Sequence, residues 1–250
     1  MKIKSDKILI NVLTVLVALI CLFPPYVILV TSLQGEGQVF SIPAKFVPKP
    51  IQWRNYVDVW TSMPLARYLL NGLIVSGGSI VLTLIIACLA AYPLARLQIP
   101  GRKAIMLSLL FTQMFAPAVV LLPLFRIFQK TFLLNTLTSL IIVDTTFSLA
   151  FSTLLITGFF ETVPQEVLEA ATIDGCGKLG ILTKILLPVS SSGIFVVSIY
   201  VFTQVWNEFL FAFTFVSSND KFTPIVGLFN FIQVPGVQLP QWHLAMAMAV

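Results

Sequence analysis

Residues 68–95 read YLLNGLIVSGGSIVLTLIIACLAAYPLA, and no acidic or basic side chain interrupts them. A helix needs about 20 mostly apolar residues to cross the hydrocarbon core of a bilayer, so this run is long enough to span one. Four further runs of similar character flank it, and each is long enough to cross with some tilt. The five predicted spans cover residues 8–33, 68–95, 104–128, 137–160 and 185–216.

The composition of the chain agrees with a membrane location. Hydrophobic residues make up 58% of the chain, charged residues only 10%, and the mean hydropathy is +0.97. Soluble proteins carry about 25% charged residues, so this composition fits the bilayer as solvent. We predict an all-α membrane protein, a polytopic helical bundle that forms a single transmembrane domain over residues 1–250. Its helices are expected to be kinked at Pro24, Pro25, Pro93, Pro117, Pro123 and Pro188.

A sixth apolar run begins at His243 and reaches Val250. Eight helical residues extend about 12 Å, whereas the hydrocarbon core is about 30 Å thick. We therefore expect residues 243–250 to be the start of a sixth span and the natural chain to continue beyond it.

The net charge of +5 is best explained by membrane topology. With the N-terminus inside, the short inner segments hold eight Lys and Arg residues and the longer outer segments hold seven. Positive charge crowded into short loops favours the cytoplasmic side, which predicts a cytoplasmic N-terminus. No basic run with interleaved aromatic residues occurs in a polar segment, so the sequence excludes a nucleic-acid-binding protein.

The chain lacks the residues that an enzyme would need. It holds one histidine and three cysteines without paired spacing, so no catalytic triad, metal cluster or disulfide framework is expected. The segment GCGKL at residues 175–179 partly matches the pattern of a phosphate-binding loop. It lacks the four-residue gap after the first glycine and the Ser or Thr after the lysine, so we expect it to bind no nucleotide.

The inner loop over residues 161–184 differs from the other loops, because it concentrates four acidic residues in a chain with few charges. Pro164 suits the first turn of a helix, and Thr162 is expected to cap it. The helix should extend to about Ile173, and Gly175 should end it, because glycine adopts the left-handed conformation at low cost. The sequence predicts a short helix across the membrane face.

One side of this short helix is narrow, and alanine there allows another protein's backbone to approach closely. A generic amphipathic helix in the membrane interface would have a similar pattern, so the residues alone leave both readings open. The narrow side consists of Val167, Ala170, Ala171 and Asp174.

The loop also carries a spaced pattern: Glu169-Ala170-Ala171, three residues, Gly175, nine residues, Ile185, one residue, Leu187-Pro188. It resembles the inner-loop signature of binding-protein-dependent ABC transporter permeases, and every position matches. Further matches point to the carbohydrate branch, similar to the second permease of maltose-type importers. They are residues 91–96 (AYPLAR), 100–102 (PGR) and 206–208 (WNE), with Thr223-Pro224 and Gly227-Leu228 ahead of Trp242.

The resemblance implies an ABC type I importer permease fold and a division of labour. Two permeases form the path, a dimer of ATPase subunits sits below, and an extracytoplasmic binding protein delivers a sugar or oligosaccharide for import. The resemblance also implies that the second permease is a different chain, and that ATP and Mg are bound by the ATPase while this chain binds no cofactor. The location implied is the cytoplasmic (inner) membrane of a bacterium or archaeon.

The same resemblance assigns roles to two segments. The short inner helix would seat in a cleft of the ATPase, so that closure of the ATP-bound pair tilts the spans toward outward opening. The loop over residues 217–242, which precedes the sixth run, would reach the binding protein through Thr223, Pro224, Gly227 and Leu228. The coupling residues implied by the inner-loop match are Glu166, Glu169, Ala170, Ala171, Asp174, Gly175, Ile185, Leu187 and Pro188.

Charged residues inside the predicted spans are costly and therefore point to function. Arg126 lies near a span end and can reach the interface. Asp144 could line the solute path or pair with Arg126, and Glu208 with Asn207 could meet sugar hydroxyls or tie helices together. The alternative function is an ion-coupled secondary transporter or channel with Asp144 and Glu208 as its relay, which would have no use for the inner-loop signature.

Overall fold

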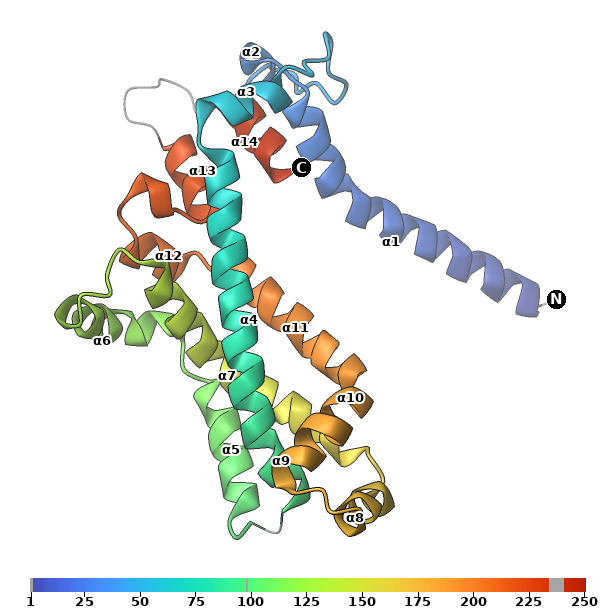
Figure 1. Cartoon of the computed structure of the whole chain (residues 1–250). Helices are drawn as coiled ribbons and strands as arrows, with labels where there is room; N and C mark the ends of the chain where they lie inside the picture. Colours follow the sequence, from blue (N-terminus) through green and yellow to red (C-terminus); the bar gives the residue numbers. More distant parts are fainter. Residues whose placement is uncertain (1, 98, 234–240) are drawn as a thin grey trace. The chain divides into compact units, whose positions relative to one another are not determined.

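A computed structural model describes residues 2–97, 99–233 and 241–250, which form helices joined by turns and loops (Figure 1). The chain divides into two compact units, each described here by itself. Unit 1 comprises Met1–Ala66 and Gly227–Val250, and unit 2 comprises Arg67–Val226.

Unit 1 contains a long N-terminal helix and several shorter helices. The helices α1 (Lys2–Ser32) and α3 (Asn55–Ser62) pack on α14 (Trp242–Ala249), and α2 (Glu36–Val39) lies in the loop between them. Asn55 Nδ2 donates to the backbone oxygens of Ser32 and Gln34, both at 2.8 Å, which pins the loop to the end of α1. The apolar side chains of α1 from Ile10 to Leu29 are largely exposed, as expected for a helix that meets lipid.

Unit 2 holds the rest of the fold, and α7 is its central element. This helix packs against α5, α11 and α12, with Leu140, Ile156 and Phe160 fully buried in the core. Its elements are α4 (Leu65–Arg96), whose first two residues belong to unit 1, α5 (Arg102–Thr112), α6 (Pro117–Lys130), α7 (Leu137–Glu161), α8 (Gln165–Ile173), α9 (Lys178–Ile181), the π-helix η1 (Leu182–Leu186), α10 (Leu187–Val189), α11 (Ser191–Trp206), α12 (Leu210–Phe215) and the 3-10 helix η2 (Asn219–Lys221). The helix α13 (Pro224–Ile232) begins in unit 2, and its residues from 227 onward belong to unit 1.

Close approach of α7 and α11 depends on a glycine. A Cβ atom added to Gly193 of α11 would lie 2.3 Å from the ring of Phe159 in α7. Small residues at such contacts let membrane helices pack through dispersion alone, because lipid provides no hydrophobic driving force between helices. Ala87 and Ala91 of α4 are also small core residues, and both are fully buried.

The prediction of an all-helical polytopic fold is confirmed. Within the described residues, three helices are long and apolar enough to cross a membrane: Ile10–Ser32, Leu65–Arg96 and Leu137–Glu161. Two bent helix pairs raise the number to five if each pair is one span, namely Arg102–Thr112 with Pro117–Lys130, bent by 89°, and Lys178–Val189 with Ser191–Trp206, bent by 79°.

Two of the predicted runs are therefore divided between helices. Pro117 begins α6 as its first residue instead of kinking a continuous helix, and Ala116 before it is extended, with φ −64° and ψ 131°. A proline disfavours the helical conformation in the residue that precedes it, which accounts for the break. By contrast, Pro24 and Pro25 lie inside α1 and Pro93 lies inside α4 without ending them.

Asn135 ties the start of α7 to the segment that follows α12. Its backbone N–H donates to Phe215 O at 2.7 Å, and its Oδ1 accepts from the N–H groups of Ser217 and Ser218. Lys221 Nζ donates to Asn135 O at 2.7 Å. Asn135 has φ +57°, a conformation that asparagine tolerates better than most residues.

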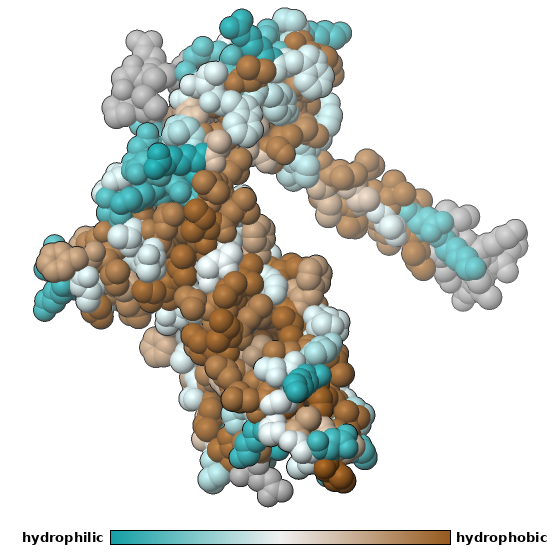
Figure 2. Space-filling view, viewed as in Figure 1, coloured by the Kyte–Doolittle hydropathy of each residue, from teal (hydrophilic) through white to brown (hydrophobic). Residues whose placement is uncertain are grey.

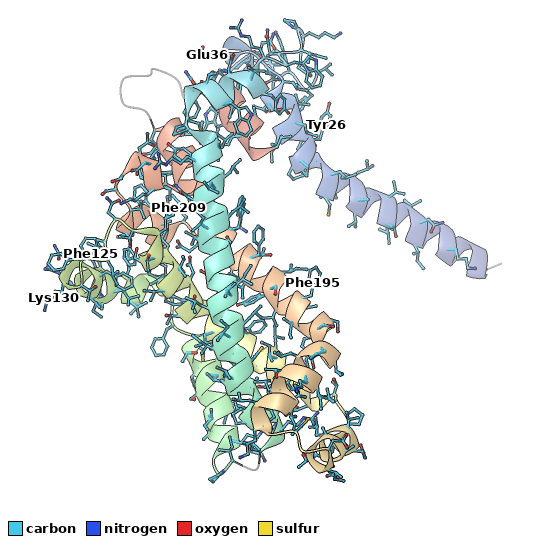
Figure 3. All side chains as sticks on the ribbon, in the orientation of Figure 1. Tyr26, Glu36, Phe125, Lys130, Phe195 and Phe209 are labelled. Atoms are coloured by element: carbon cyan, nitrogen blue, oxygen red, sulfur yellow. The ribbon has the colours of Figure 1, made fainter. Side chains whose placement is uncertain are left out.

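The surface of unit 2 is apolar along its length. Figure 2 shows hydrophobic side chains over the middle of this unit and hydrophilic ones gathered toward its ends. Leu73, Leu89 and Phe195 are among the exposed apolar residues, and Phe195 projects from α11 in Figure 3. Exposed apolar area on this scale is expected where lipid or another membrane chain covers the protein.

Candidate functional site

The inner loop forms the predicted short helix, α8, which ends at Ile173 as expected. Pro164 lies immediately before its first residue, where a missing N–H costs nothing. The expectation that Thr162 caps α8 is wrong, because its hydroxyl donates to Phe159 O at 2.7 Å and so closes the last turn of α7. The carbonyls at the end of a helix need partners, and Thr162 satisfies one of them.

Gly175 terminates α8 in the left-handed conformation, as the sequence predicts, with φ +84°. Cys176 N–H donates to Ala171 O at 2.9 Å, and Gly175 N–H donates to Thr172 O at 3.1 Å. These two bonds form a Schellman motif, which fixes the direction of the chain after the helix.

The two sides of α8 face different surroundings. Leu168 and Ala171 are buried against the core of unit 2, so Ala171 helps to seat the helix on its own chain. The other side is exposed and combines negative charge with an apolar tip, since Ile173 is 87% exposed. The predicted coupling residues on the exposed side are Glu166, Glu169, Ala170, Asp174 and Gly175, while farther along Ile185 and Leu187 are half-buried and Pro188 is exposed.

Two arginines hold the connection from α7 into α8. Arg96, the last residue of α4, donates through Nη2 to the backbone oxygens of Phe160 and Val163, and its Nη1 lies 3.5 Å from Gln165 Oε1. Arg102 at the start of α5 forms an ion pair with Glu161. The sequence pattern did not indicate this role for Arg96, although Arg96 is the first charged residue after the long uncharged run.

We expect Arg96→Gln to loosen α8. Hydrogen bonds from a charged group contribute about 1.5–3 kcal/mol, so backbone amides of residues 163–173 should exchange with deuterium at least about tenfold faster in the purified protein. Arg126→Gln serves as a control, since Arg126 is exposed and lies on α6. Equal exchange in the two variants would show that Arg96 does not hold the loop.

Unit 2 also has an open cavity of about 910 Å³ between the α5–α6 break, the middle of α7 and the junction of α11 with α12. The three residues predicted for a solute path, Asp144, Asn207 and Glu208, all line it. The structure therefore brings together side chains from two predicted spans. Its wall also carries aromatic residues (Phe115, Phe147, Tyr200, Phe209 and Phe211) and neutral polar ones (Thr112, Gln113, Thr146, Ser148 and Gln204).

Glu208 and Asn207 form hydrogen bonds with backbone groups at helix ends. Glu208 Oε1 accepts from Phe211 N–H at 2.7 Å and its Oε2 accepts from Ala212 N–H at 2.9 Å, so the carboxylate caps α12. Asn207 Nδ2 donates to Thr203 O at 2.7 Å in the last turn of α11. These contacts support the reading in which the pair holds helices in place.

Asp144 differs from Glu208, because its carboxylate has no hydrogen bond or ion pair with another described residue. It is 6% exposed, and it lines both the large cavity and an adjoining water-sized one of about 10 Å³. The alternative pairing with Arg126 is not formed, and Arg126 is exposed. A buried carboxylate needs a partner, so Asp144 is poised to accept hydrogen bonds from whatever occupies the cavity.

The residues predicted to contact a binding protein are not prominent on the surface. Thr223 and Gly227 are buried, and Pro224 and Leu228 are partly buried, around the start of α13. Residues 234–240 of the same predicted loop lie outside the described residues. Within the part of the chain that the structure describes, no group of three or more His, Cys, Asp or Glu side chains could hold a metal ion.

Comparison with known proteins identifies relatives over most of the chain. The sequence model of the family described as "Binding-protein-dependent transport system inner membrane component" matches residues 80–250. The chain is 37% identical to the "Sulfoquinovosyl glycerol transport system permease protein SmoH" of Agrobacterium fabrum, over 83% of this chain and 73% of that protein. It is 35% identical to the "Inner membrane ABC transporter permease protein YcjP" of Escherichia coli, over 87% and 78%.

A third relative and a solved structure extend this picture. The "Melibiose/raffinose/stachyose import permease protein MelC" of Bacillus subtilis is 31% identical over 99% of this chain and 88% of its own. A chain from the crystal structure of a bacterial ABC transporter involved in the import of the acidic polysaccharide alginate superposes with a TM-score of 0.84 at 22% identity, covering 98% of this chain and 90% of that chain. The fold is therefore that of an ABC importer permease.

Proposed function

Because the chain belongs to the family of binding-protein-dependent transport system inner membrane components, we propose that it forms half of the solute path of a sugar importer and couples to its ATPase through residues 161–184. The chain is a multi-pass inner-membrane permease, and a separate ATPase subunit binds and hydrolyses the nucleotide. A binding protein and a partner permease complete the transporter. Family membership excludes the alternative of an ion-coupled carrier that works without an ATPase.

The exposed side of α8 supports docking on the ATPase. Glu166, Glu169 and Asp174 present negative charge around the apolar tip of Ile173, and this combination fits a cleft with basic and apolar walls. Gly175 sets the exit of the chain from that surface. The remaining residues of the signature, including Ala171, Ile185 and Leu187, would seat the loop on its own helices so that force on α8 reaches α11.

The position of α8 in the chain supports a cytoplasmic N-terminus. Four crossings precede α8 if the bent pair of α5 and α6 counts as one span, so the N-terminus and α8 lie on the same side. The ATPase is on the cytoplasmic side, where the basic inner loops also belong. On this reading the two units are parts of one permease domain.

The cavity in unit 2 supports a path for a sugar. Its volume of about 910 Å³ is at the upper end of the roughly 300–1,000 Å³ that ligand pockets occupy. Aromatic walls with a few polar groups suit the apolar faces and the hydroxyls of a sugar, and MelC carries sugars in its name. Asp144 would accept hydrogen bonds from hydroxyl groups, while Asn207 and Glu208 would shape the wall.

Two finer points of the assembly also belong to this proposal. We infer a dimer of ATPase subunits and a partner permease that is a different chain, as the likeness to maltose-type second permeases implies. We further infer that Thr223, Pro224, Gly227 and Leu228 position the loop that meets the binding protein, since their burial suits a supporting role better than direct contact.

Charge reversal on α8 tests the docking proposal. The full-length protein would be expressed with its neighbouring genes and purified through a tag on this chain. Glu169→Lys should lower the amount of co-purified ATPase at least about tenfold, because breaking a close charge pair costs about 2–5 kcal/mol. Asp220→Lys makes the same change at the other end of unit 2 and should retain the ATPase. Full retention in Glu169→Lys would refute docking through this face.

A further inference from the structure

The wall of the large cavity contains acidic residues but no basic ones among the described residues. Among the described residues that line it, two are acidic, Asp144 and Glu208, and none is Lys, Arg or His. The adjoining small cavity has the same two carboxylates and likewise no basic residue in its described lining. Any solute in this part of the path therefore meets two carboxyl groups and no basic side chain from the described lining of this chain.

The basic residues of unit 2 are engaged or lie elsewhere. Arg96 and Arg102 hold the loop into α8, and Lys221 donates to Asn135 O. Arg126 and Lys130 are exposed on α6, and Figure 3 shows Lys130 at the tip of that helix, well apart from Phe209 of the cavity wall. None of these residues belongs to the lining.

The two carboxylates contribute unequally. Glu208 has both oxygens on the N–H groups at the start of α12, where the helix end offsets part of a negative charge. Asp144 is only 6% exposed, lacks a partner among the described residues, and lines the cavity. Its acceptor capacity is not used by the described residues.

We infer that this cavity admits neutral or cationic sugars, such as unmodified or amino sugars, and rejects acidic ones; this rests on the proposal that the cavity is the solute path. The hydroxyl or ammonium groups of such a sugar donate to Asp144, which satisfies the buried carboxylate. A uronate, sulfonate or phosphate finds no basic side chain in this chain's half of the path to pair with its charge, and the two carboxyl groups there disfavour an anion beside them.

The inference separates this chain from a transporter of the same fold. The superposable structure belongs to a transporter involved in the import of an acidic polysaccharide, yet the likeness at 22% identity concerns the fold alone. Charge selection depends on side chains in the cavity wall and not on helix arrangement. Acidic residues without a basic counterpart therefore favour a different solute class from the one named for that transporter.

Charged thiol reagents test this without knowledge of the natural sugar. Thr146, which is exposed and lines the cavity, would be changed to Cys in a chain whose Cys21, Cys88 and Cys176 are replaced by serine. The assembled transporter in membrane vesicles would react with hydroxyethyl, trimethylammonioethyl and sulfonatoethyl methanethiosulfonates. Each rate would be divided by the rate of the same reagent with 2-mercaptoethanol.

The cationic reagent should react at least about tenfold faster than the anionic one after this normalisation, because the described lining holds two carboxyl groups and no basic side chain. Asp144→Asn should lower the ratio severalfold, whereas Asp220→Asn, a carboxylate outside the cavity, should leave it unchanged. Gln204→Cys on α11 provides a second reporter if Thr146→Cys does not assemble.

The three reagents separate the two proposals. If the neutral reagent fails to react with either cysteine, the cavity is not an aqueous path. Both the proposal of a solute path and the inference of charge selection are then refuted. If the neutral reagent reacts but the cationic and anionic rates are equal, or the anion is faster, the path stands and the charge inference is overturned. A high ratio that Asp144→Asn does not lower would also overturn the role of Asp144.

Discussion

Replacing Gly175 with valine is expected to abolish solute-driven transport while the complex still assembles. Gly175 has φ +84°, where a residue with a Cβ atom costs about 1–2 kcal/mol and a β-branched one more. The strain would break the Schellman bonds that end α8 and would redirect the exposed Asp174 and Ile173. We expect uptake into vesicles to fall at least about tenfold, with ATPase co-purification largely retained.

Two matched substitutions show whether backbone conformation is the cause. Gly177→Val makes the same change two residues away, where φ is −69° and a Cβ atom would meet nothing within 4 Å, so transport should persist. Gly175→Asn should have an intermediate effect, because asparagine tolerates the left-handed region. Equal transport by Gly175→Val and Gly177→Val would contradict the assigned role of helix termination.

Gly193→Ala is the second change with a large expected effect, this time on stability. The new Cβ would lie 2.3 Å from Cγ of Phe159 and 2.5 and 2.7 Å from its Cδ atoms. Because Cγ is close to the backbone, the ring cannot turn out of the way without moving α7 away from α11. Overpacking of this kind costs typically about 1–3 kcal/mol, which corresponds to a drop in Tm of roughly 3–10 °C for a chain of this size.

Gly158→Ala provides the control for this prediction. Gly158 lies in α7, one residue before Phe159, and a Cβ atom there would meet nothing within 4 Å. Alanine is a better helix former than glycine, so the melting temperature in detergent should be unchanged or slightly raised. If both variants melted at the wild-type temperature, the close α7–α11 contact would not limit stability.

The membrane class and the helical fold could be predicted because they depend on composition within single runs. The end of α8 was equally predictable, since a glycine in the left-handed conformation is a local requirement at Gly175. The breaks at 113–116, near Ser190 and at 207–209 were not predictable from hydropathy. Apolar residues satisfy a hydropathy window whether the helix through them is straight or bent.

In the candidate site, too, some features could be predicted from the sequence and others could not. Asp144, Asn207 and Glu208 could be predicted because polar groups in apolar runs are rare and costly. That Glu208 caps α12 while Asp144 has no partner among the described residues depends on the helix break after Trp206, which no sequence pattern indicated. Thr162 was assigned to the wrong helix because it lies between two helix ends that both need partners.

The tie at Asn135 has a mechanical consequence for the long helix that follows it. The start of α7 cannot leave the end of α12 without losing the hydrogen bonds to Phe215, Ser217, Ser218 and Lys221. A helix of 25 residues is about 37 Å long, and α8 is attached at its opposite end. Because α7 is held at its start by these hydrogen bonds, a force on α8 should displace the end of α7 most and the residues near Asn135 least.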